Sequence, residues 1–496
     1  MSDRIKKQLY YLIIFIIILL GIYIRVLFFS YARPFWNDES ALAINVIGRN
    51  FFELFLPLDL DQTAPPLFAC LSKFFGYFIK QSELAFRFVP LLSSIISIPV
   101  FFLLCRNFCH NKISNIFALF LFTFNYQIVY YSQEFKQYSS DILIFLLVLL
   151  SYFYIDFKSA KKSSLIAFGC VLGVTLWASY TSVFAVLALA FALVIKNFSH
   201  LKNIWKNYLY CFVPFGLFLL CFWVFKQNLN NSFYLHIFWH DGFLNWDLSN
   251  LSKLINDNLH FYFVNFNNKF FVWLTLIIGS CVLLFRLKNK SYSLIMFSIL
   301  FAFLLSYLHI YPLYNRVSLY LSPLLFIVMA MAFDLPLEET IKLKWVKKAL
   351  TVFWGVISAF VFLHFCTNYF HLLKIKILDK QFYIEATPQL LKIAESKMKK
   401  DDILYVSAMS SINYRFYSNF YNIDNVILET FPAYDIEMYK KVFNKLQSGR
   451  TYYLIMTHSG DKMLEFNNLV NFIQSQRDVE IISDDSYNLL IRFIKR

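Results

Sequence analysis

The sequence predicts a polytopic all-α membrane protein of about 11 transmembrane helices, with interfacial helices and a C-terminal extracytoplasmic α/β domain. Three observations support this fold class. The 496 residues are 59% hydrophobic, against roughly 45–50% in soluble domains. Eleven apolar stretches approach the length that crosses a bilayer as a helix. Lys and Arg concentrate in every second loop between them.

Each apolar stretch is bounded by polar or charged residues. The predicted spans are 8–30, 85–105, 113–130, 139–156, 163–179, 182–196, 208–226, 269–286, 291–309, 317–333 and 349–370. The first span follows Arg4, Lys6 and Lys7 and lacks a cleavage site of small residues. We therefore interpret it as an uncleaved signal anchor.

The distribution of cations predicts the orientation in the inner (plasma) membrane. A cytoplasmic N-terminus places 18 Lys and Arg residues in short cytoplasmic segments, and only ten before residue 371 in the longer segments opposite. An excess of cations in short loops marks the cytoplasmic side. Residues 371–496 carry 17 Lys and Arg against 15 Asp and Glu, so most of the net charge of +15 lies among the spans. This charge indicates topology rather than binding of nucleic acid.

These spans define a transmembrane domain over residues 1–370. Its long extracytoplasmic loops are predicted at 31–84 and 226–268. Residues 64–79 are apolar, but they begin at Pro65-Pro66 and contain Lys73. An extra span here would reverse every later loop, so we expect a helix that lies in the membrane interface with Lys73 reaching water.

Residues 371–496 alternate helix-like and strand-like segments, which predicts an extracytoplasmic α/β domain with a largely parallel sheet. The helix-like segments are 386–398, 435–446 and 462–474. The strand-like segments are 403–406, 426–428, 452–456, 479–482 and 489–494. No glycine-rich phosphate loop opens a helix here, so we expect no nucleotide site.

The first candidate site is the acid pair in Trp36-Asn37-Asp38-Glu39, shortly after the first span. Carboxylates this close to the apolar core are costly to place without a role. Asp38 is the candidate general base, with Glu39 as a second acid, an orienting group or a metal ligand. The alternative is a solvated pair of loop acids.

The other candidates lie in two further outer loops. Glu134, Lys136 and Tyr138 sit between spans three and four, where Lys136 could meet a phosphate and Glu134 could orient it or a sugar hydroxyl. A capped turn with a weak surface ion pair is the alternative. Arg316 precedes span ten and has the paired donors that bind phosphate. It could instead reach lipid headgroups.

A metal centre is a weaker hypothesis. His236, His240 and Asp241 lie close together in the 226–268 loop, but no fourth ligand is defined. Two cations could suffice without a metal, although Asp38 and Glu39 could also bind a divalent ion.

Several of these motifs together resemble GT-C superfamily glycosyltransferases that use lipid-linked sugars, in particular the bacterial branch related to protein O-mannosyltransferases and aminoarabinose transferases. The resemblance covers residues 1 to about 330 and is most specific in the first 140. The motifs are Phe35-Trp36-Asn37-Asp38-Glu39, Gln62 to Phe68, Gly76, Ser82-Glu83 with Arg87, Tyr131-Ser132-Gln133-Glu134 with Lys136 and Tyr138, and Arg316 with Pro323.

The resemblance implies that Asp38 is the catalytic base, that Glu39 is its companion, and that the donor is a polyprenyl-phosphate sugar. Two positions depart from the family pattern. Pro65-Pro66 stands where aminoarabinose-type members have Lys-Pro, and Arg316-Val317 stands where many relatives have Arg-Tyr. These positions therefore do not assign the sugar, which is a hexose or a pentose.

The resulting hypothesis is an inverting glycosyltransferase of the cell envelope. It transfers sugar from a polyprenyl-phosphate carrier to a hydroxyl of a lipid, glycan or protein acceptor on the extracytoplasmic face. The alternative is a polytopic lipid or glycan transporter or flippase, but such proteins place ionisable residues in mid-membrane. Here the spans are nearly free of charge. A non-catalytic scaffold is the third hypothesis.

Overall fold

The computed structural model describes most of the chain. The described residues are 3–227, 237–264, 269–337, 343–350, 352–356, 385–428, 436–457, 471–473, 475, 479–484 and 488–495. They form two compact units. The first contains residues 1–31, 51–57 and 63–371, and the second contains residues 32–50, 58–62 and 372–496. The second unit thus joins part of the first long loop to the C-terminal residues.

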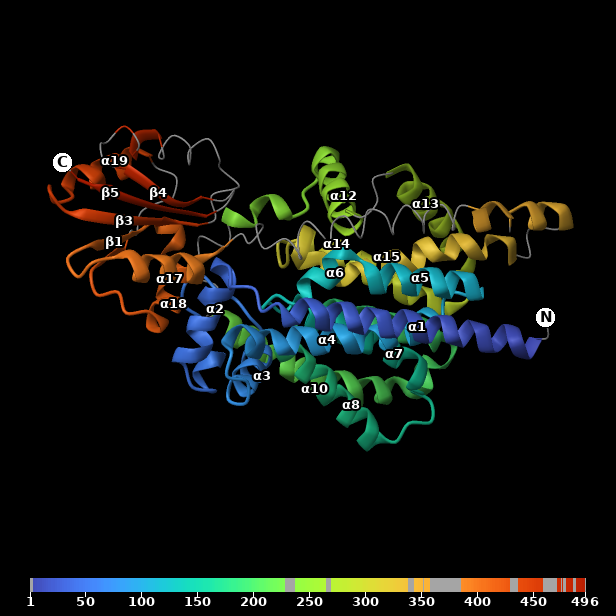
Figure 1. Cartoon of the computed structure of the whole chain (residues 1–496). Coiled ribbons are helices and arrows are strands. Elements are labelled where there is room, and N and C mark those ends of the chain that lie inside the picture. Colours follow the sequence, from blue (N-terminus) through green and yellow to red (C-terminus); the bar gives the residue numbers. More distant parts are fainter. Residues whose placement is uncertain are drawn as a thin grey trace. The chain divides into compact units, whose positions relative to one another are not determined.

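The first unit is helical (Figure 1). Its described α-helices include α1 (Asp3–Ser30), α3 (Pro66–Gly76), α4 (Ser82–Cys105), α5 (Lys112–Phe124), α6 (Tyr126–Tyr131), α7 (Tyr138–Tyr154), α8 (Lys162–Ala178), α9 (Ser182–Lys196), α10 (Leu201–Gln227), α12 (Leu248–Tyr262), α13 (Lys269–Arg286), α14 (Ser293–Tyr307) and α15 (Ser322–Met331). Short 3₁₀ helices include η1 (Glu53–Phe55), η2 (Phe198–His200), η3 (His240–Gly242), η4 (Lys290–Tyr292), η5 (Asn315–Leu321) and η6 (Ala332–Leu337).

Six helical segments of the described chain are long and apolar enough to cross a membrane, and several shorter apolar helices accompany them. The prediction of a multi-pass membrane protein is therefore confirmed. Ten predicted spans correspond to helices, and the span at 113–130 divides at Asn125 into α5 and α6. The Asn125 side chain accepts a hydrogen bond from the Ile128 amide and so caps α6. Most of the last predicted span, 349–370, lies outside the described residues.

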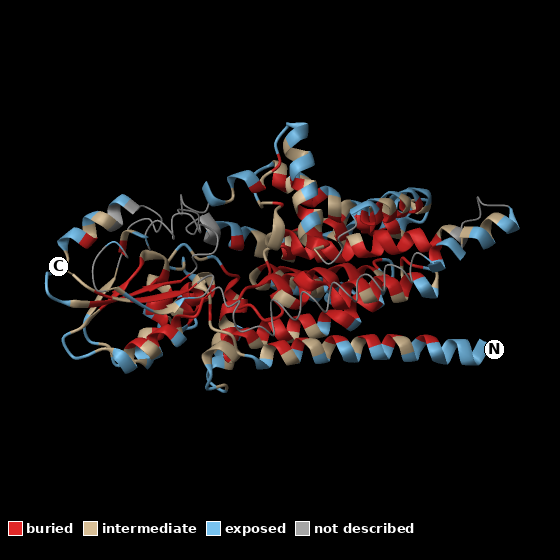
Figure 2. Ribbon diagram, turned by 45° about the horizontal axis from the view of Figure 1, so that its top comes forward, coloured by how far each residue is buried: buried red, intermediate tan, exposed pale blue. Residues whose placement is uncertain are grey.

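Helix α1 packs against α4 and α5 through a buried arginine. Arg25 Nε donates to Ser94 Oγ at 2.7 Å, and its Nη1 donates to the carbonyl oxygens of Gly21 and Thr123 at 3.0 Å each. These partners offset the cost of a charge inside the bundle. The opposite side of α1 is exposed, as Figure 2 shows, and its exposed residues include large apolar side chains, which is the pattern of a helix that faces lipid.

Asp334 joins three helical segments at the other end of the bundle. Its carboxylate accepts hydrogen bonds from the backbone amides of His110 and Asn111 at 2.9 Å each and from the Ser114 hydroxyl. Arg286 at the end of α13 pairs with it at 2.8 Å. Asp334 thus fixes η6 to the start of α5 and the end of α13.

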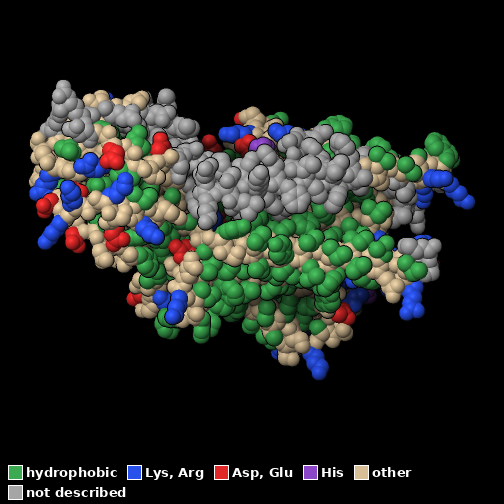
Figure 3. Space-filling view, viewed as in Figure 1, with side chains coloured by type: hydrophobic (Ala, Val, Ile, Leu, Met, Phe, Trp, Pro, Cys, Tyr) green, Lys and Arg blue, Asp and Glu red, His purple; other side chains and the backbone are tan. Residues whose placement is uncertain are grey.

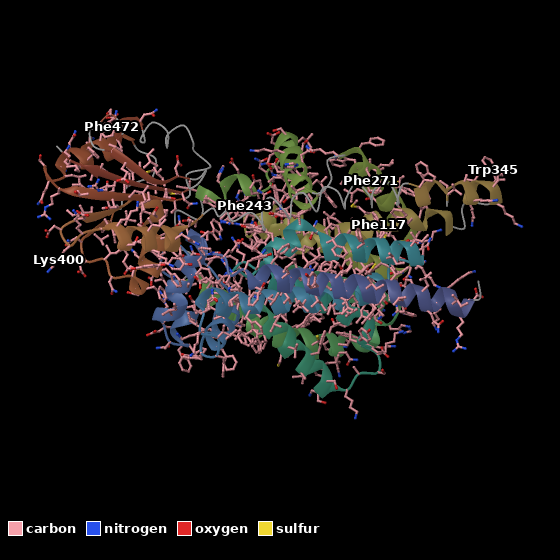
Figure 4. All side chains as sticks on the ribbon, viewed as in Figure 1. Phe117, Phe243, Phe271, Trp345, Lys400 and Phe472 are labelled. Carbon is pink, nitrogen blue, oxygen red and sulfur yellow. The ribbon has the colours of Figure 1, made fainter. Side chains whose placement is uncertain are left out.

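The visible surface of the helical unit is mainly hydrophobic, as Figure 3 shows, whereas charged side chains of both signs cover the C-terminal residues. Within the bundle, aromatic packing joins distant segments. Phe117 of α5, labelled in Figure 4, packs against Phe333 with ring centroids 4.5 Å apart. The orientation of this bundle in the membrane stays a prediction.

The second unit contains a five-stranded sheet in the order β2-β1-β3-β5-β4. The strands are β1 (Ile403–Val406), β2 (Val426–Leu428), β3 (Thr451–Met456), β4 (Val479–Asp484) and β5 (Leu489–Ile494), so all five predicted strands are confirmed. Strand β1 is parallel to β2 and β3, but β5 is antiparallel to β3 and β4. The prediction of a largely parallel sheet is therefore wrong, since two of the four strand pairings are antiparallel. The connection between β4 and β5 is too short for a parallel crossover, so these two strands must pair antiparallel.

Helices cover both faces of this sheet (Figure 1). They are α17 (Thr387–Lys397), α18 (Ser411–Tyr417) and α19 (Ile436–Lys445). Phe443 of α19 packs into a core with Tyr452 and Phe493, while Leu390 and Leu391 of α17 are buried. The predicted helices 386–398 and 435–446 are confirmed, and most of the predicted helix 462–474 lies outside the described residues.

Candidate active site

The acid pair lies at the start of α2 (Asn37–Gly48), in the second unit. Trp36 is the N-cap in an extended conformation, and its carbonyl accepts hydrogen bonds from the amides of Glu39 and Ser40 at 2.9 Å each. Both carboxylates therefore belong to the first helical turn, where the helix dipole favours negative charge.

The structure gives the two acids different surroundings. Glu39 is buried, its Oε2 accepts a hydrogen bond from the Trp36 amide at 3.4 Å, and it lies 3.9 Å from the Arg33 guanidinium. Asp38 is half-buried. Glu39 therefore stabilises the first turn of α2 from its buried side, and Asp38 is the acid that is partly accessible to solvent.

A second short segment of the first loop secures α2. The Asn45 side chain accepts from the Asp59 amide at 2.8 Å and donates to the Asp59 carbonyl at 3.1 Å. Arg49 pairs with the Asp59 carboxylate at 2.8 Å. Residues 58–62 are thus fixed against the helix that carries the acid pair.

Glu134, Lys136 and Tyr138 belong to the first unit, in the turn between α6 and α7. All three are buried. The Lys136 amide donates to the Glu134 carbonyl at 2.7 Å, and the Asp141 amide donates to the Gln137 carbonyl at 2.8 Å to begin α7. The interpretation as an exposed surface ion pair is therefore wrong for these positions, because neither charged side chain is solvated.

Aromatic rings hold this turn in place. Phe135 is fully buried and stacks on Phe68 of α3 and Phe86 of α4, with centroids 5.8 and 5.0 Å apart. Tyr131 and Tyr138 meet edge to face at 5.0 Å. Because these rings come from four helices, the position of the two charged side chains depends on the packed bundle.

Tyr131 relates this turn to Arg316. Burial raises the pKa of the Tyr131 hydroxyl well above its usual value, the charge of Glu134 raises this pKa further, and the charge of Arg316 lowers it. The structure therefore brings Glu134, Tyr138 and Arg316 around one tyrosine, although they come from loops about 180 residues apart. Asp38 and Glu39 belong to the other unit.

Arg316 lies in η5, and its guanidinium is 5.8 Å from the centroid of the Trp239 ring. Its backbone is held by α12. Asn258 Oδ1 accepts from the Asn315 amide at 2.8 Å, and the Tyr262 hydroxyl contacts Ser318 Oγ at 2.6 Å. Asn315 adopts a left-handed conformation with φ of 43°, which asparagine tolerates better than most residues.

The sequence analysis missed the two supporting residues of α12. Asn258 is buried, and its Nδ2 also donates to the Leu313 carbonyl at 2.9 Å. Tyr262 is buried as well, and its carbonyl accepts from Asn125 Nδ2 at 2.6 Å. The signal that could have found Asn258 is an amide on the apolar side of an amphipathic helix.

No group of three His, Cys, Asp or Glu side chains able to hold a metal ion occurs in the described part of the chain. His240 Nδ1 and Asp241 Oδ1 are 3.2 Å apart on an exposed turn. His236, the third member of the hypothetical metal site, lies outside the described residues.

Comparison with known proteins agrees with this architecture. Residues 63–225 match the family model described as dolichyl-phosphate-mannose-protein mannosyltransferase. A search of proteins of curated function finds no match.

Solved structures with a similar fold cover nearly the whole chain. ArnT from Cupriavidus metallidurans, bound to undecaprenyl phosphate, aligns with a TM-score of 0.52 at 12% identity over 99% of this chain and 98% of that one. The oligosaccharyltransferase of Archaeoglobus fulgidus in its apo form aligns with a TM-score of 0.56 at 12% identity, covering 94% and 72%. The archaeal oligosaccharyltransferase AglB from the same organism, with an inhibitory peptide and a dolichol-phosphate, gives 0.50 at 14% identity over 92% and 70%.

The family model matches residues 63–225, and over nearly its whole length the chain has the fold of ArnT and of the archaeal oligosaccharyltransferase. The resemblance seen in the sequence motifs is thereby confirmed.

Proposed function

We propose that the protein is an inverting glycosyltransferase that uses a polyprenyl-phosphate sugar as donor. An acceptor hydroxyl of a lipid, glycan or protein attacks the anomeric carbon, and its proton passes to the Asp38 carboxylate. The bond between the anomeric carbon and the phosphate oxygen breaks. Polyprenyl phosphate leaves with one additional negative charge.

Glu134 and Lys136 are both buried, and Glu134 and Arg316 both act electrostatically on Tyr131; these observations carry the proposal. Charged groups buried at the edge of an apolar bundle are costly unless they have a role. Lys136 and Arg316 are the cations that would meet the phosphate, and Glu134 and Tyr138 would orient the sugar. Fixed cations act most strongly where charge develops, with single groups worth roughly 3–4 kcal/mol.

The difference in burial between Asp38 and Glu39 supports Asp38 as the base. A base needs access to the acceptor proton, and Asp38 is half-buried while Glu39 is fully buried against Arg33 and the Trp36 amide. Glu39 is then the residue that orients the turn.

A lipid-linked donor is supported by the similar proteins, since the related structures contain undecaprenyl phosphate and a dolichol-phosphate. The extracytoplasmic face is supported by the sidedness of Lys and Arg in the short loops. Nucleotide sugars are made in the cytoplasm, so a carrier lipid is the chemically reasonable donor on the other side.

The test uses the full chain in lipid nanodiscs. A panel of undecaprenyl-phosphate sugars (mannose, glucose, galactose and arabinose) is incubated with membranes from cells that lack the protein, and labelled products and released undecaprenyl phosphate are measured by mass spectrometry. We expect one sugar to be consumed by the wild type and not by Asp38→Asn.

Comparison of envelope glycans and lipids from cells with and without the gene identifies the transferred group. Consumption of no donor, together with an unchanged envelope, would overturn the glycosyltransferase proposal. Movement of an intact lipid-linked sugar between leaflets, without cleavage, would support the transporter instead.

A further inference from the structure

The carboxyl edge of the sheet in the second unit is closed by polar residues. The parallel strands β1 and β3 continue into Ser407 and Thr457, both buried. Ser410 Oγ lies 3.0 Å from Ser407 Oγ and accepts from the Thr457 amide at 2.9 Å. In open α/β sheets this edge is where ligands usually bind.

Glu385 is held at the same edge. The amide of the next residue, Ala386, donates to Asn488 Oδ1 at 2.8 Å, and Asn488 directly precedes β5, which begins opposite the end of β3. Glu385 is buried and interacts with the side chains of Thr457 and Asn413 and with the backbone amide of Asn37. A carboxyl of the C-terminal residues thus meets the residue that begins α2.

Two further hydrogen bonds join this edge to the same short segment. The Phe35 amide donates to the Tyr417 hydroxyl at 2.8 Å, and Asn37 Nδ2 donates to the Met409 carbonyl at 2.8 Å. The Phe35 ring is fully buried and meets Phe416 edge to face at 5.2 Å. The edge that normally receives a ligand is therefore occupied by residues 35–37 of the chain itself.

These contacts fix the backbone directly before Asp38. Phe35 and Asn37 are held through main-chain and side-chain groups, so both the position and the direction of the first turn of α2 are set. A buried amide that loses its hydrogen-bond partner destabilises the fold. Residues 35–37 therefore strongly prefer this position at the edge of the sheet.

We propose that the carboxyl edge of the C-terminal sheet binds residues 35–37 as an internal ligand, and that Tyr417 and Glu385 are positioning residues that aim Asp38 at the acceptor hydroxyl. This proposal rests on the proposed function, because it takes Asp38 to be the base. The C-terminal residues are then part of the catalytic machinery of the enzyme. Their role is to hold the base, since the proposed phosphate-binding residues belong to the other unit.

A displaced base slows proton transfer without altering donor binding, and misplacement of a reacting group by about 1 Å can reduce the rate about 100-fold. For Tyr417→Phe, which keeps the ring and removes one hydrogen bond, we expect kcat to fall about tenfold with an unchanged KM for the donor. Glu385→Leu should have a similar or larger effect. Glu385→Gln, which retains an acceptor oxygen for the Asn37 amide, should restore most of kcat.

Tyr421→Phe is the matched control, because the Tyr421 hydroxyl donates to the Pro388 carbonyl at 2.8 Å within the C-terminal residues. It removes a hydrogen bond between a tyrosine hydroxyl and the backbone without touching residues 35–37. Kinetics are measured with the undecaprenyl-phosphate sugar that the wild type consumes.

Hydrogen–deuterium exchange provides a readout that does not require activity. We expect Tyr417→Phe and Glu385→Leu to increase exchange in the peptide that covers residues 35–48, with no change in peptides of α4. Tyr421→Phe should leave both unchanged. If Tyr417→Phe cannot be purified, Asn37→Ala tests the same contact between residues 35–37 and the sheet edge, because it removes the hydrogen bond from the Asn37 side chain to the Met409 carbonyl.

Unchanged exchange in residues 35–48 for both Tyr417→Phe and Glu385→Leu would contradict the proposal that the sheet edge holds residues 35–37. Increased exchange with wild-type kcat would overturn the positioning role. A wild type that consumes no polyprenyl-phosphate sugar would instead contradict the proposed function. The exchange experiment would still show whether the sheet edge holds residues 35–37.

Discussion

Asn258 Oδ1 accepts a hydrogen bond from the Asn315 amide at 2.8 Å and another from Ser318 Oγ at 2.8 Å. One buried amide of α12 therefore holds both sides of Arg316. The loop that carries this arginine is thus not free to adjust, and its guanidinium is presented by a fixed backbone. Preorganised charge of this kind needs no rearrangement during the reaction.

Replacement of Asn258 should accordingly affect Arg316 without changing its charge. We expect Asn258→Leu to lower kcat/KM for the undecaprenyl-phosphate donor about tenfold, because it leaves the Asn315 amide unsatisfied and releases the loop. Asn256→Leu on the exposed side of the same helix is the control. Equal kinetics for both variants would show that the loop is held by other contacts.

Removal of the buried lysine should weaken donor binding. Lys136→Met keeps much of the side-chain volume and removes the charge, so we expect weaker binding of undecaprenyl phosphate and a loss of about 100-fold or more in turnover. Binding of undecaprenol, which lacks the phosphate, should not change. Lys253→Met on exposed α12 is the control, and equal affinity of both variants for undecaprenyl phosphate would exclude Lys136 as a phosphate ligand.

Asp38 and Glu39 should respond differently to amidation. Asp38→Asn should abolish transfer with little effect on thermal stability, because the side chain is only half-buried and serves as the base. Glu39→Gln should reduce thermal stability, since it weakens a buried contact to Arg33. Transfer at the wild-type rate by Asp38→Asn would remove it as the base, and Asp401→Asn on the surface serves as the control.

Close packing of helices should make Gly279 intolerant of substitution. A Cβ atom at Gly279 of α13 would lie 1.8 Å from the Val328 carbonyl oxygen of α15, whereas one at Gly216 of α10 meets nothing within 4 Å. Small residues let membrane helices approach in this way. We expect Gly279→Ala to lower the melting temperature in detergent and Gly216→Ala to leave it unchanged or raised. Equal melting temperatures would contradict the close α13–α15 contact.

Glu385 should make stability depend on pH. Burial raises the pKa of its carboxyl to about 8, while its interactions with Thr457, Asn413 and the Asn37 amide lower it. Because the folded-state pKa lies above the unfolded value, the contribution to stability is present below about pH 4.5 and is lost as the pH rises to about 8. The change is on the order of a few kcal/mol.

Glu385→Gln removes this titration. We expect the melting temperature of the wild type to fall more steeply than that of Glu385→Gln between pH 5 and 8, measured in the same detergent. Parallel curves for the two proteins would show that the carboxyl does not titrate in this range.

Much of the fold could be predicted from local patterns. The strand at 403–406 and the strand at 489–494 were predicted with their observed bounds, because short runs of branched and aromatic residues between polar segments favour strands. The antiparallel pairing of β5 with β4 follows from their short connection, but the pairing of β5 with β3 could not be predicted, because it depends on which other strand receives β5. The break at Asn125 was also missed, because the apolar run continues past it without a proline or glycine.

The candidate site was predicted only in part. Glu134, Lys136 and Arg316 were visible as isolated charges near apolar spans, but the common relation of Glu134 and Arg316 to Tyr131 appears only after α6, α7 and η5 have packed. Tyr417 and Glu385 carry no local signal, because a phenol and a carboxyl acquire a positioning role only from a distant partner.

The sequence by itself determined that the chain is a multi-pass membrane protein with a mixed helix-and-strand C-terminus, and which charged side chains merit attention. These properties follow from hydrophobicity and periodicity, which are summed over neighbouring residues. Only the tertiary structure decided that Glu39 is enclosed while Asp38 is partly accessible, and that residues 35–37 occupy the edge of a sheet built more than 350 residues later. Hydrogen bonds and burial act between atoms that are close in space, and local sequence does not encode that proximity.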